Sequence, residues 1–401
     1  MSDAVSASMA GADRWPGAAE PTLIGVTTPG RATSTGIVAI ATGLMGVGAV
    51  MTFSATASID RPVLGWPLWD YPAMRQLVFL VAALVAMLAT ALVPYRVFVG
   101  QSGRRALLLM LLALAGSALV LMPGVGYMAN NARRWIPLGP ESYGLRIQPS
   151  EVVKLGLPVF LAAWMGLRAD VRKFWTGFLP MVLVIGAAAG LVGIEDFGTA
   201  ALLAVVGGGM LMVGGARWFH LLLLVLPTVP AFGYLLVSRA HRMERLLIFL
   251  DIWRDPEGKG YQAIQSLCTI ASGGWWGRGL GAGFVKGYLP AARTDFIFSV
   301  LCEELGFVGA VAVIGLLVAL VWQGWKVFNR CGDPVGRLLA LGITLTIGVQ
   351  AVINVAVVTV SVPTKGIALP LVSAGGSGAV FLAIMVGILA NIPRLRVSER
   401  S

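Results

Sequence analysis

A short polar stretch before a long apolar run carries the residue types that could take up a proton. Residues 293–304 read Arg-Thr-Asp-Phe-Ile-Phe-Ser-Val-Leu-Cys-Glu-Glu. Asp295 stands at the expected outer mouth of a membrane span, and Glu303 would lie roughly 12 Å deeper along a helix. Ionisable groups inside a span are costly and usually line a polar cavity. A carboxylate at such a mouth suits the removal of a proton from a sugar hydroxyl. The alternative is a structural carboxylate paired with a nearby arginine.

Two further polar groups stand where expected helices begin. Pro149 suits the first turn of a helix, and the i, i+3 spacing of Glu151 and Lys154 lets these side chains pair on one face. Helix stabilisation explains this pair as well as catalysis does. Asp196 follows Glu195 between two apolar runs, so both carboxylates are expected on the outer side.

A Pro/Gly-interrupted entry into the last apolar run carries a lysine and two serines. It includes Pro-Thr-Lys-Gly at 363–366 and Ser-Ala-Gly-Gly-Ser-Gly at 373–378, which contains Ser373 and Ser377. Such breaks are tolerated where backbone lines a cavity rather than lipid. Lys365 can bind a phosphate as a point charge, or it can simply reach the membrane interface.

The loops on the expected outer side are rich in cations. Arg133 and Arg134 belong to the first of them, and Arg242, Arg245 and Lys286 to a longer one. A cationic surface concentrates an anionic partner. The alternative is a solvated loop whose arginines pair with its own carboxylates. Nucleic acid is a poor candidate on the outer face of a membrane.

The composition indicates the elements that must position these residues. The 401-residue chain is 57% hydrophobic and 12% charged, whereas a soluble domain carries about 25% charged residues. Spans need about 20 apolar residues. We therefore predict an all-α integral membrane protein of about ten transmembrane helices, with a large extracytoplasmic loop at 238–296 between spans 7 and 8. The predicted spans are 34–56, 75–95, 104–123, 151–168, 177–194, 199–215, 218–237, 297–325, 336–360 and 373–392.

The short loops set the orientation. Lys and Arg gather in the loops of one side, which predicts that this side and both termini are cytoplasmic. Residues 1–33 are expected to be a disordered tail, 34–394 the membrane domain and 395–401 a second cytoplasmic tail. The three cysteines form neither a metal-ligand spacing nor a disulfide framework, and with two histidines a His-based site is not expected.

At these residues the chain resembles the SEDS family, the FtsW/RodA proteins of cell-wall synthesis. The matching motifs run in family order from about residue 34 to the end. They lie at 131–136, 148–151, 154–155, 196–199, 242–249, 255–256, 260–262 with Ser266, 273–290, 294–298, 303–307, and Asn354 with 363–377. Five positions depart from the family's usual residues: Glu195 replaces Pro, Ala291 Glu, Arg293 His, Ala374 Tyr and Gly378 Ser. Asp295 is retained.

The resemblance implies a peptidoglycan glycosyltransferase, slightly closer to FtsW than to RodA, in the bacterial cytoplasmic membrane. Its substrate would be lipid II, a disaccharide-pentapeptide on undecaprenyl diphosphate. Asp295 would be the general base for the acceptor sugar's 4-hydroxyl, and outer cations would stabilise the leaving diphosphate. The substrate-binding candidates are Arg133, Arg134, Glu151, Lys154, Asp196, Arg242, Arg245, Lys286, Glu303, Lys365, Ser373 and Ser377.

The resemblance also implies partners. A class B penicillin-binding protein with a single span is expected, together with other proteins of division or elongation. A divalent cation such as Mg²⁺ or Mn²⁺ could assist the reaction, although the sequence shows no ligand motif. Two other functions fit the same features: a transporter that flips lipid II, and a non-catalytic scaffold that recruits the transpeptidase.

Overall fold

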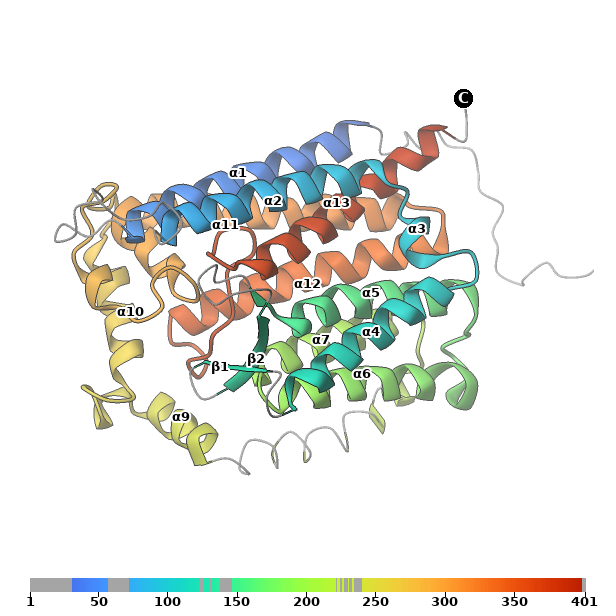
Figure 1. Ribbon diagram of the computed structural model, residues 1–401, viewed down its shortest axis with the longest axis horizontal. Helices are drawn as coiled ribbons and strands as arrows, with labels where there is room; N and C mark the ends of the chain where they lie inside the picture. Colours follow the sequence, from blue (N-terminus) through green and yellow to red (C-terminus); the bar gives the residue numbers. More distant parts are fainter. Residues whose placement is uncertain are drawn as a thin grey trace, which may run out of the picture.

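The long helices of the molecule lie side by side along its longest axis (Figure 1). The computed structural model describes residues 31–56, 72–122, 126–129, 132–137, 146–220 and 240–398, with single positions between 222 and 233. The long helices are α1 (Arg31–Thr56), α2 (Pro72–Leu92), α4 (Arg104–Val120), α5 (Pro149–Leu167), α6 (Leu179–Gly193), α7 (Phe197–Val213), α11 (Ile297–Arg330), α12 (Pro334–Val358) and α13 (Ser377–Ser398).

These helices confirm the prediction of an all-helical protein with several membrane spans. Within the described residues, seven helices are long and apolar enough to cross a membrane, and α7 is a shorter apolar helix. Each of these helices, and α4, coincides with a predicted span. The predicted span at 218–237 falls mostly outside the described residues, so the number ten stays a prediction.

The helices differ in how they are buried, and the difference follows their neighbours. α5 is apolar around its circumference and is mostly buried, because α4, α7 and α12 surround it. α2 packs on α13 with one face and leaves Val81 and Val85 exposed on the other. An exposed apolar face of this kind suits contact with lipid.

Two helices extend a few residues beyond the predicted boundaries of the membrane domain. α1 already begins at Arg31 rather than at 34, and α13 continues to Ser398 beyond the predicted boundary at 394. The two helices pack together, and Arg394 Nε donates a hydrogen bond to Ser34 Oγ over 2.7 Å. This contact holds both ends in helical form. Residues 1–30 lie outside the described residues.

A small antiparallel sheet departs from the all-α prediction. It consists of β1 (Tyr127–Ala129), β2 (Ala132–Pro137) and β3 (Arg146–Ile147) in the order β1-β2-β3. Met128 pairs with Arg133, and Ile136 pairs with Ile147. The strands are too short for a periodic pattern in the sequence to reveal them.

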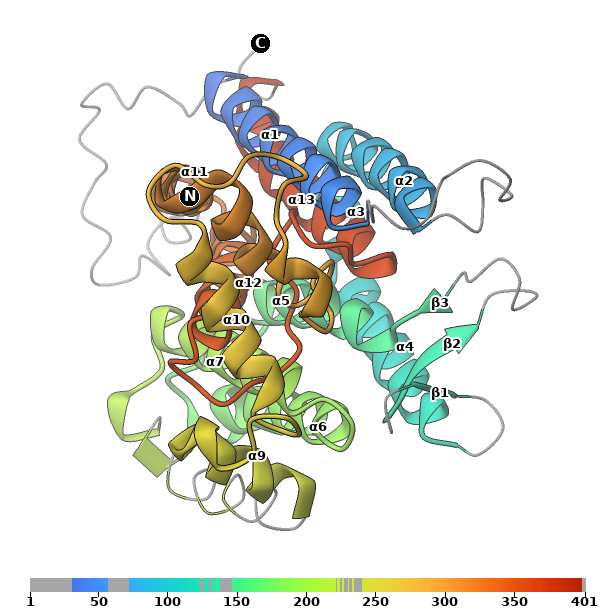
Figure 2. The ribbon, with the colours of Figure 1, turned by 90° about the vertical axis from the view of Figure 1, so that its left-hand side faces the viewer.

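The predicted long loop folds into an ordered cap at one end of the helices (Figure 2). Its elements are α9 (Ala240–Leu250), η4 (Ile252–Arg254), α10 (Tyr261–Ser272) and η5 (Val285–Tyr288). α10 packs on α11, where Ser266 Oγ lies 2.8 Å from Ser299 Oγ and donates to the carbonyl of Val358 over 2.7 Å. These buried contacts fix the position of the segment that precedes α11.

Candidate functional site

A polar cavity of about 780 Å³ lies at the end of the molecule that carries the sheet and α10. Its walls come from segments far apart in the sequence: the starts of α5 and α7, strands β2 and β3, the middle of α12, and the loops before α11 and α13. The charged side chains that line it are Arg134, Arg146, Glu151, Lys154, Asp196, Asp295 and Lys365. Four cations and three carboxylates therefore face one space.

Backbone contacts hold Asp295 on one wall of this cavity. It lies in the turn just before α11, and Asn354 Nδ2 donates to its carbonyl over 2.8 Å and to the carbonyl of Ile367 over 2.7 Å. Asn354 lies in α12 and is 1% exposed. A buried amide that donates to two loops at once fixes the loop before α11 against the loop before α13.

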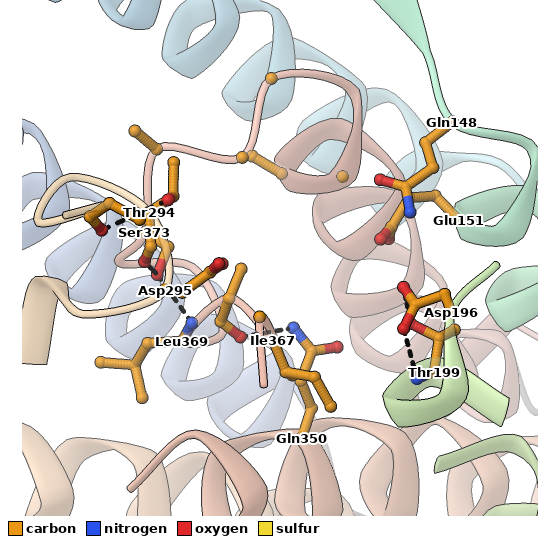
Figure 3. Close-up of a pocket in the computed structure, with 18 of the residues that line it drawn as sticks. Gln148, Glu151, Asp196, Thr199, Thr294, Asp295, Gln350, Ile367, Leu369 and Ser373 are labelled. Carbon is orange, nitrogen blue, oxygen red and sulfur yellow. Dashed lines mark hydrogen bonds between the residues drawn. The ribbon is translucent and has the colours of Figure 1, made fainter. Parts of the chain in front are cut away.

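A serine completes this connection between the two loops (Figure 3). Ser373 Oγ donates to the carbonyl of Thr294 over 2.6 Å and accepts the N–H of Leu369 over 2.7 Å. The N–H of Ala374 donates to the carbonyl of Arg293 over 3.0 Å. Backbone groups on both sides of Asp295 are thus paired, and the carboxylate is presented to the cavity.

The surroundings of Asp295 make its carboxylate more basic than usual. Burial raises the pKa of Asp295 to about 6, the negative charge of Asp196 acts in the same direction, and Arg134 opposes both. At neutral pH such a group is mostly ionised, yet it holds a proton better than an exposed aspartate. This is the range in which a general base works well.

The opposite wall is built around the start of α7 (Figure 3). Asp196 caps this helix, because its carboxylate accepts the N–H of Thr199 over 3.2 Å and the Thr199 hydroxyl over 2.9 Å. Arg134 Nη1 lies 4.0 Å from the same carboxylate, and Arg134 Nη2 donates to the carbonyl of Glu195. Strand β2 is therefore joined to the helix cap by its arginine.

A buried ion pair forms the floor of the cavity. Lys154 Nζ lies 2.7 Å from Glu151 Oε2 and 3.2 Å from Gln350 Oε1. Gln350 Nε2 donates in turn to the carbonyl of Ala368 over 2.9 Å. The pair thus does more than stabilise α5, because it connects α5 through α12 to the loop before α13.

Two further cations are supported by aromatic rings. Lys365 Nζ lies 4.3 Å from the centre of the Phe197 ring, and the Arg146 guanidinium lies 3.8 Å from the centre of the Tyr127 ring. A cation over a ring is oriented by the negative charge of the ring's face. Both charges remain suited to an anionic ligand in the cavity.

The structure brings together most of the residues predicted from sequence. Asp295, Arg134, Glu151, Lys154, Asp196, Lys365 and Ser373 all line the cavity. Ser377 does not line the cavity; it is buried, and its Oγ accepts the N–H of Gln148, which does line it, over 3.3 Å. The side chains of Arg242, Arg245 and Lys286 lie outside what the structure describes, so their roles stay predictions.

Two predicted site residues lie elsewhere. Glu303 is fully buried away from the cavity, where its Oε1 accepts the N–H of Phe284 over 2.8 Å. A helix that ran on from Asp295 would place Glu303 roughly 12 Å deeper, but α11 begins only at Ile297, so no single helix joins the two. Arg133 lines a separate cavity of about 30 Å³, and its N–H donates to Glu195 Oε2 over 3.0 Å.

Three residues of the site were missed in the sequence. In the sequence Arg146 is one charge among several in an outer loop, Asn354 matches the family pattern without a predicted role, and Gln350 belongs to no motif. The latter two are amides four residues apart within an apolar run. Polar groups on one face of a span are a usable sign of a cavity, and this spacing could have identified them.

The departures from the family pattern are accommodated locally. Glu195 binds the N–H of Arg133, and Arg293 and Ala374 pair through their backbones. Ala291 adopts φ 56° in the turn before Asp295. A Cβ at Gly378 would lie 3.2 Å from the carboxyl carbon of Glu151, so glycine leaves that carboxylate more room.

A bound metal would have to share its ligands with a substrate. Among the described residues, no group of three or more His, Cys, Asp or Glu side chains is arranged to hold a metal ion. Mg²⁺ is often bound by one or two carboxylates together with substrate phosphates. The carboxylates of Asp295 and Asp196, on facing walls, fit that arrangement better than a protein-only site (Figure 3).

Comparisons with known proteins agree with this geometry. The family of FtsW, RodA and SpoVE, described as cell cycle proteins, matches residues 35–397. A probable peptidoglycan glycosyltransferase FtsW from Idiomarina loihiensis is 38% identical over 89% of this chain and 86% of its own length. A relative of the same description from Geobacter is 41% identical over 68% of this chain and 74% of its own.

Two solved structures share the fold. A chain from work on the structural coordination of polymerization and crosslinking by a peptidoglycan synthase complex has a TM-score of 0.71 and 31% identity. It covers 90% of this chain and 98% of its own. The rod shape determining protein RodA of Thermus thermophilus has a TM-score of 0.63 and 27% identity, covering 89% and 95%.

Proposed function

The chain belongs to the FtsW, RodA and SpoVE family of cell cycle proteins, and from that premise we propose that its cavity polymerises lipid II into glycan strands. One observation carries the proposal: a half-buried, basic carboxylate faces a space whose other walls hold four cations. A sugar hydroxyl needs a proton acceptor, and a diphosphate leaving group needs positive charge.

Asp295 is the proposed general base. It takes the proton of the acceptor sugar's 4-hydroxyl while that oxygen attacks the anomeric carbon of the donor. The bond from that carbon to the diphosphate breaks, and the electron pair leaves with undecaprenyl diphosphate. Attack opposite the leaving group inverts the anomeric centre. Asn354 and Ser373 act as positioning residues, because they hold the backbone on which Asp295 stands.

The cations are proposed to stabilise the diphosphate. Arg146 and Lys365 rest on aromatic rings, and Arg134 is shared with Asp196. Phosphate oxygens can accept from all three. Phe79 of α2 and Leu382 of α13 add an apolar wall, which suits the first isoprene units of the lipid. A Mg²⁺ or Mn²⁺ ion is proposed to arrive with the diphosphate and to contact Asp295 or Asp196.

The proposed reaction takes place at the membrane surface, together with a partner protein. The cavity opens on the outer side of the bacterial cytoplasmic membrane, with both termini in the cytoplasm, as the Lys and Arg of the short loops indicate. A single-span class B penicillin-binding protein is the proposed partner, which the likeness to a peptidoglycan synthase complex supports. The FtsW names of the relatives favour a role in division.

Polymerisation of labelled lipid II by the purified chain tests the function. The assay compares the native chain with Asp295→Ala, each with and without the partner transpeptidase. We expect glycan strands from the native chain and a rate at least about 100-fold lower from the variant, since a positioned base contributes roughly 10²–10⁴ in rate. Asp251→Ala, at an exposed position in the outer cap, serves as the matched control.

The same samples separate the alternatives. Movement of lipid II across the membrane of vesicles, without glycan polymer, would indicate that the protein is a flippase and not a polymerase. Retained binding of the transpeptidase with neither polymer nor lipid movement would replace it by a scaffold. Equal polymer from native chain and Asp295→Ala would remove Asp295 from the reaction while leaving the glycosyltransferase assignment in place.

A further inference from the structure

The elbow between α2 and α4 lies at the end of the molecule opposite α10 (Figure 1). It holds a second cavity, of about 590 Å³. The elbow is formed by the short helix α3 (Arg96–Val99) and a turn at 100–103. Arg96, Arg104 and Arg105 line this cavity together with Val97 and Ser102. Among the described residues that line it, none is acidic.

Of the three arginines that line this elbow cavity, Arg104 and Arg105 form no ion pair with the described part of the chain. Arg96 Nη2 lies 3.9 Å from Asp333, but Arg96 is 62% exposed and such a pair is weak. Asp333 also caps α12 and accepts the hydroxyl of Tyr95. Arg105 Nη1 donates to the carbonyl of Val97 over 3.3 Å. The guanidinium of Arg104 makes no hydrogen bond or ion pair with the described part of the chain.

The backbone at the start of α4 adds to the positive charge around the cavity. α4 begins at Arg104, and its N-cap, Gly103, supplies no side-chain acceptor for the first turn. The first N–H groups of a helix have no partner within the helix, and they carry partial positive charge. They stand at the same place as two arginines and an open cavity, so the position favours an oxyanion.

An apolar surface borders the cavity. Val97 in the elbow is 46% exposed, and Leu108 and Leu112 in α4 are 57% and 62% exposed. A free phosphate would use only the arginines, whereas an amphiphile would use both surfaces. Basic pockets between membrane helices on the cytoplasmic side bind acidic lipid headgroups in this way.

We propose that the elbow cavity binds the phosphate headgroup of an acidic membrane phospholipid, whose acyl chains lie along α4. Phosphate oxygens accept from Arg104 and Arg105, and Val97, Leu108 and Leu112 contact the chains. The site is independent of the function proposed for the Asp295 cavity. It fastens the α2–α4 elbow to the membrane surface on the face that carries the basic short loops.

Lipid binding by the full chain tests this proposal. Detergent-purified protein is mixed with phosphatidylglycerol or phosphatidylcholine at equal concentrations, and bound lipids are counted by native mass spectrometry. We expect phosphatidylglycerol to bind more tightly. Its affinity should fall about 5-fold for each arginine lost in Arg104→Gln/Arg105→Gln. Arg172→Gln/Lys173→Gln removes the same charge from another adjacent, exposed pair and should bind as the native chain does.

Three results would overturn the proposal. An equal loss in both double variants would mean diffuse attraction rather than a site. Equal binding of the two lipids would mean that the headgroup charge is not recognised. Displacement of phosphatidylglycerol by millimolar inorganic phosphate would identify a free phosphate site instead. If the double arginine variant does not fold, Ser102→Glu places a negative charge in the cavity without removing a contact, and it should weaken phosphatidylglycerol binding.

Discussion

The carboxylate of Asp295 is controlled by two neighbours of opposite charge. Asp196 raises its pKa and Arg134 lowers it, while burial sets the pKa near 6. A base must be ionised to act, so protonation on the acid side removes activity. We expect the polymerisation rate to fall about tenfold for each pH unit below 6 and to level off above it. Initial rates between pH 5 and pH 8 measure this profile.

Removing the negative charge of Asp196 should shift the pH below which the polymerisation rate falls, here called the acid limb of the profile. Asp196→Asn keeps a side chain that can cap α7, but it no longer raises the pKa of Asp295. The acid limb should therefore shift to lower pH. Asp251→Asn caps η4 in the same way and lies outside the cavity, so its profile should equal the native one. A limb that moves upward, or stays in place, would contradict the electrostatic coupling.

Gly366 leaves room for the carboxylate of Asp295. A Cβ added there would lie 2.4 Å from Asp295 Oδ2, which forces the carboxylate to move. A displacement of about 1 Å can cost roughly 10²-fold in rate. We expect Gly366→Ala to lower kcat by that order, with a smaller change in KM. Initial rates at varied lipid II concentration separate the two.

Gly375→Ala is the control for this effect. Gly375 also lines the cavity, but a Cβ there would stand at an ordinary 3.4 Å from its nearest neighbour, the Ala379 nitrogen. The variant should keep most of the native rate. Equal rates for the two variants would show that the exact place of the Asp295 carboxylate does not limit the reaction.

At the scale of elements, apolar runs predicted the helices well and the polar connections poorly. α5 and α12 coincide with predicted spans because burial on several sides requires long apolar segments. The sheet at 127–147 depends on pairing between strands of two to six residues, which leaves no periodic trace. The place of Glu303 away from the cavity could not be predicted, because the start of α11 and its break at Gly306 depend on contacts with the loop at 273–284.

The cavity likewise has features that the sequence predicts and features that it does not. The residue types at Asp295, Glu151 and Lys365 indicated their chemistry directly. Asn354 acts through hydrogen bonds to two loops. It contacts the carbonyls of Asp295 and Ile367, which lie 59 and 13 residues away in the sequence. Such long-range contacts cannot be deduced from spacing along one chain. The sequence therefore indicated which carboxylates and cations line the cavity, and their catalytic roles stay predictions. The contacts that hold these side chains could not be predicted.

Gly306 lets the loop at 273–284 pack closely against α11. It has φ 67°, and a Cβ would meet the nitrogen of Gly277 at 2.3 Å. Gly306→Ala is strained in both conformation and packing. We expect the loop to detach, so that trypsin cleaves after Arg278 about ten times faster, as expected when the open state costs roughly 1.4 kcal/mol less.

Gly315→Ala tests whether any substitution in α11 has this effect. No atom lies within 4 Å of a Cβ at Gly315, and alanine favours a helix. Its cleavage pattern should equal the native one. Unchanged cleavage in Gly306→Ala would mean that two other contacts suffice to hold the loop: the N–H of Phe284 on Glu303, and the N–H of Gly281 on Ser54, whose hydroxyl donates to Glu304.

At the scale of the molecule, the two cavities require opposite faces of the membrane. Beyond its break at Gly306, α11 continues from 307 to Arg330. That segment alone is about 36 Å long, more than the roughly 30 Å hydrocarbon core of a bilayer, so elements at its two ends cannot share one side. The Asp295 cavity stands at its start with α10, which carries the exposed Cys268. The elbow cavity stands at the other end, where Ser102 is exposed. If the glycan is made outside, Cys268 must be external and Ser102 internal.

Labelling with a membrane-impermeant maleimide decides this orientation. In intact spheroplasts we expect Cys268 to react and a Ser102→Cys variant, made in a Cys268→Ser background, to react only after permeabilisation. Cys302 is buried and Cys331 partly buried, so a chain with Cys268→Ser alone measures their background. Reaction of Cys268 only after permeabilisation would place Asp295 at the cytosol. Lipid II polymerisation on the outer surface would then be impossible, whatever the chemistry of the cavity.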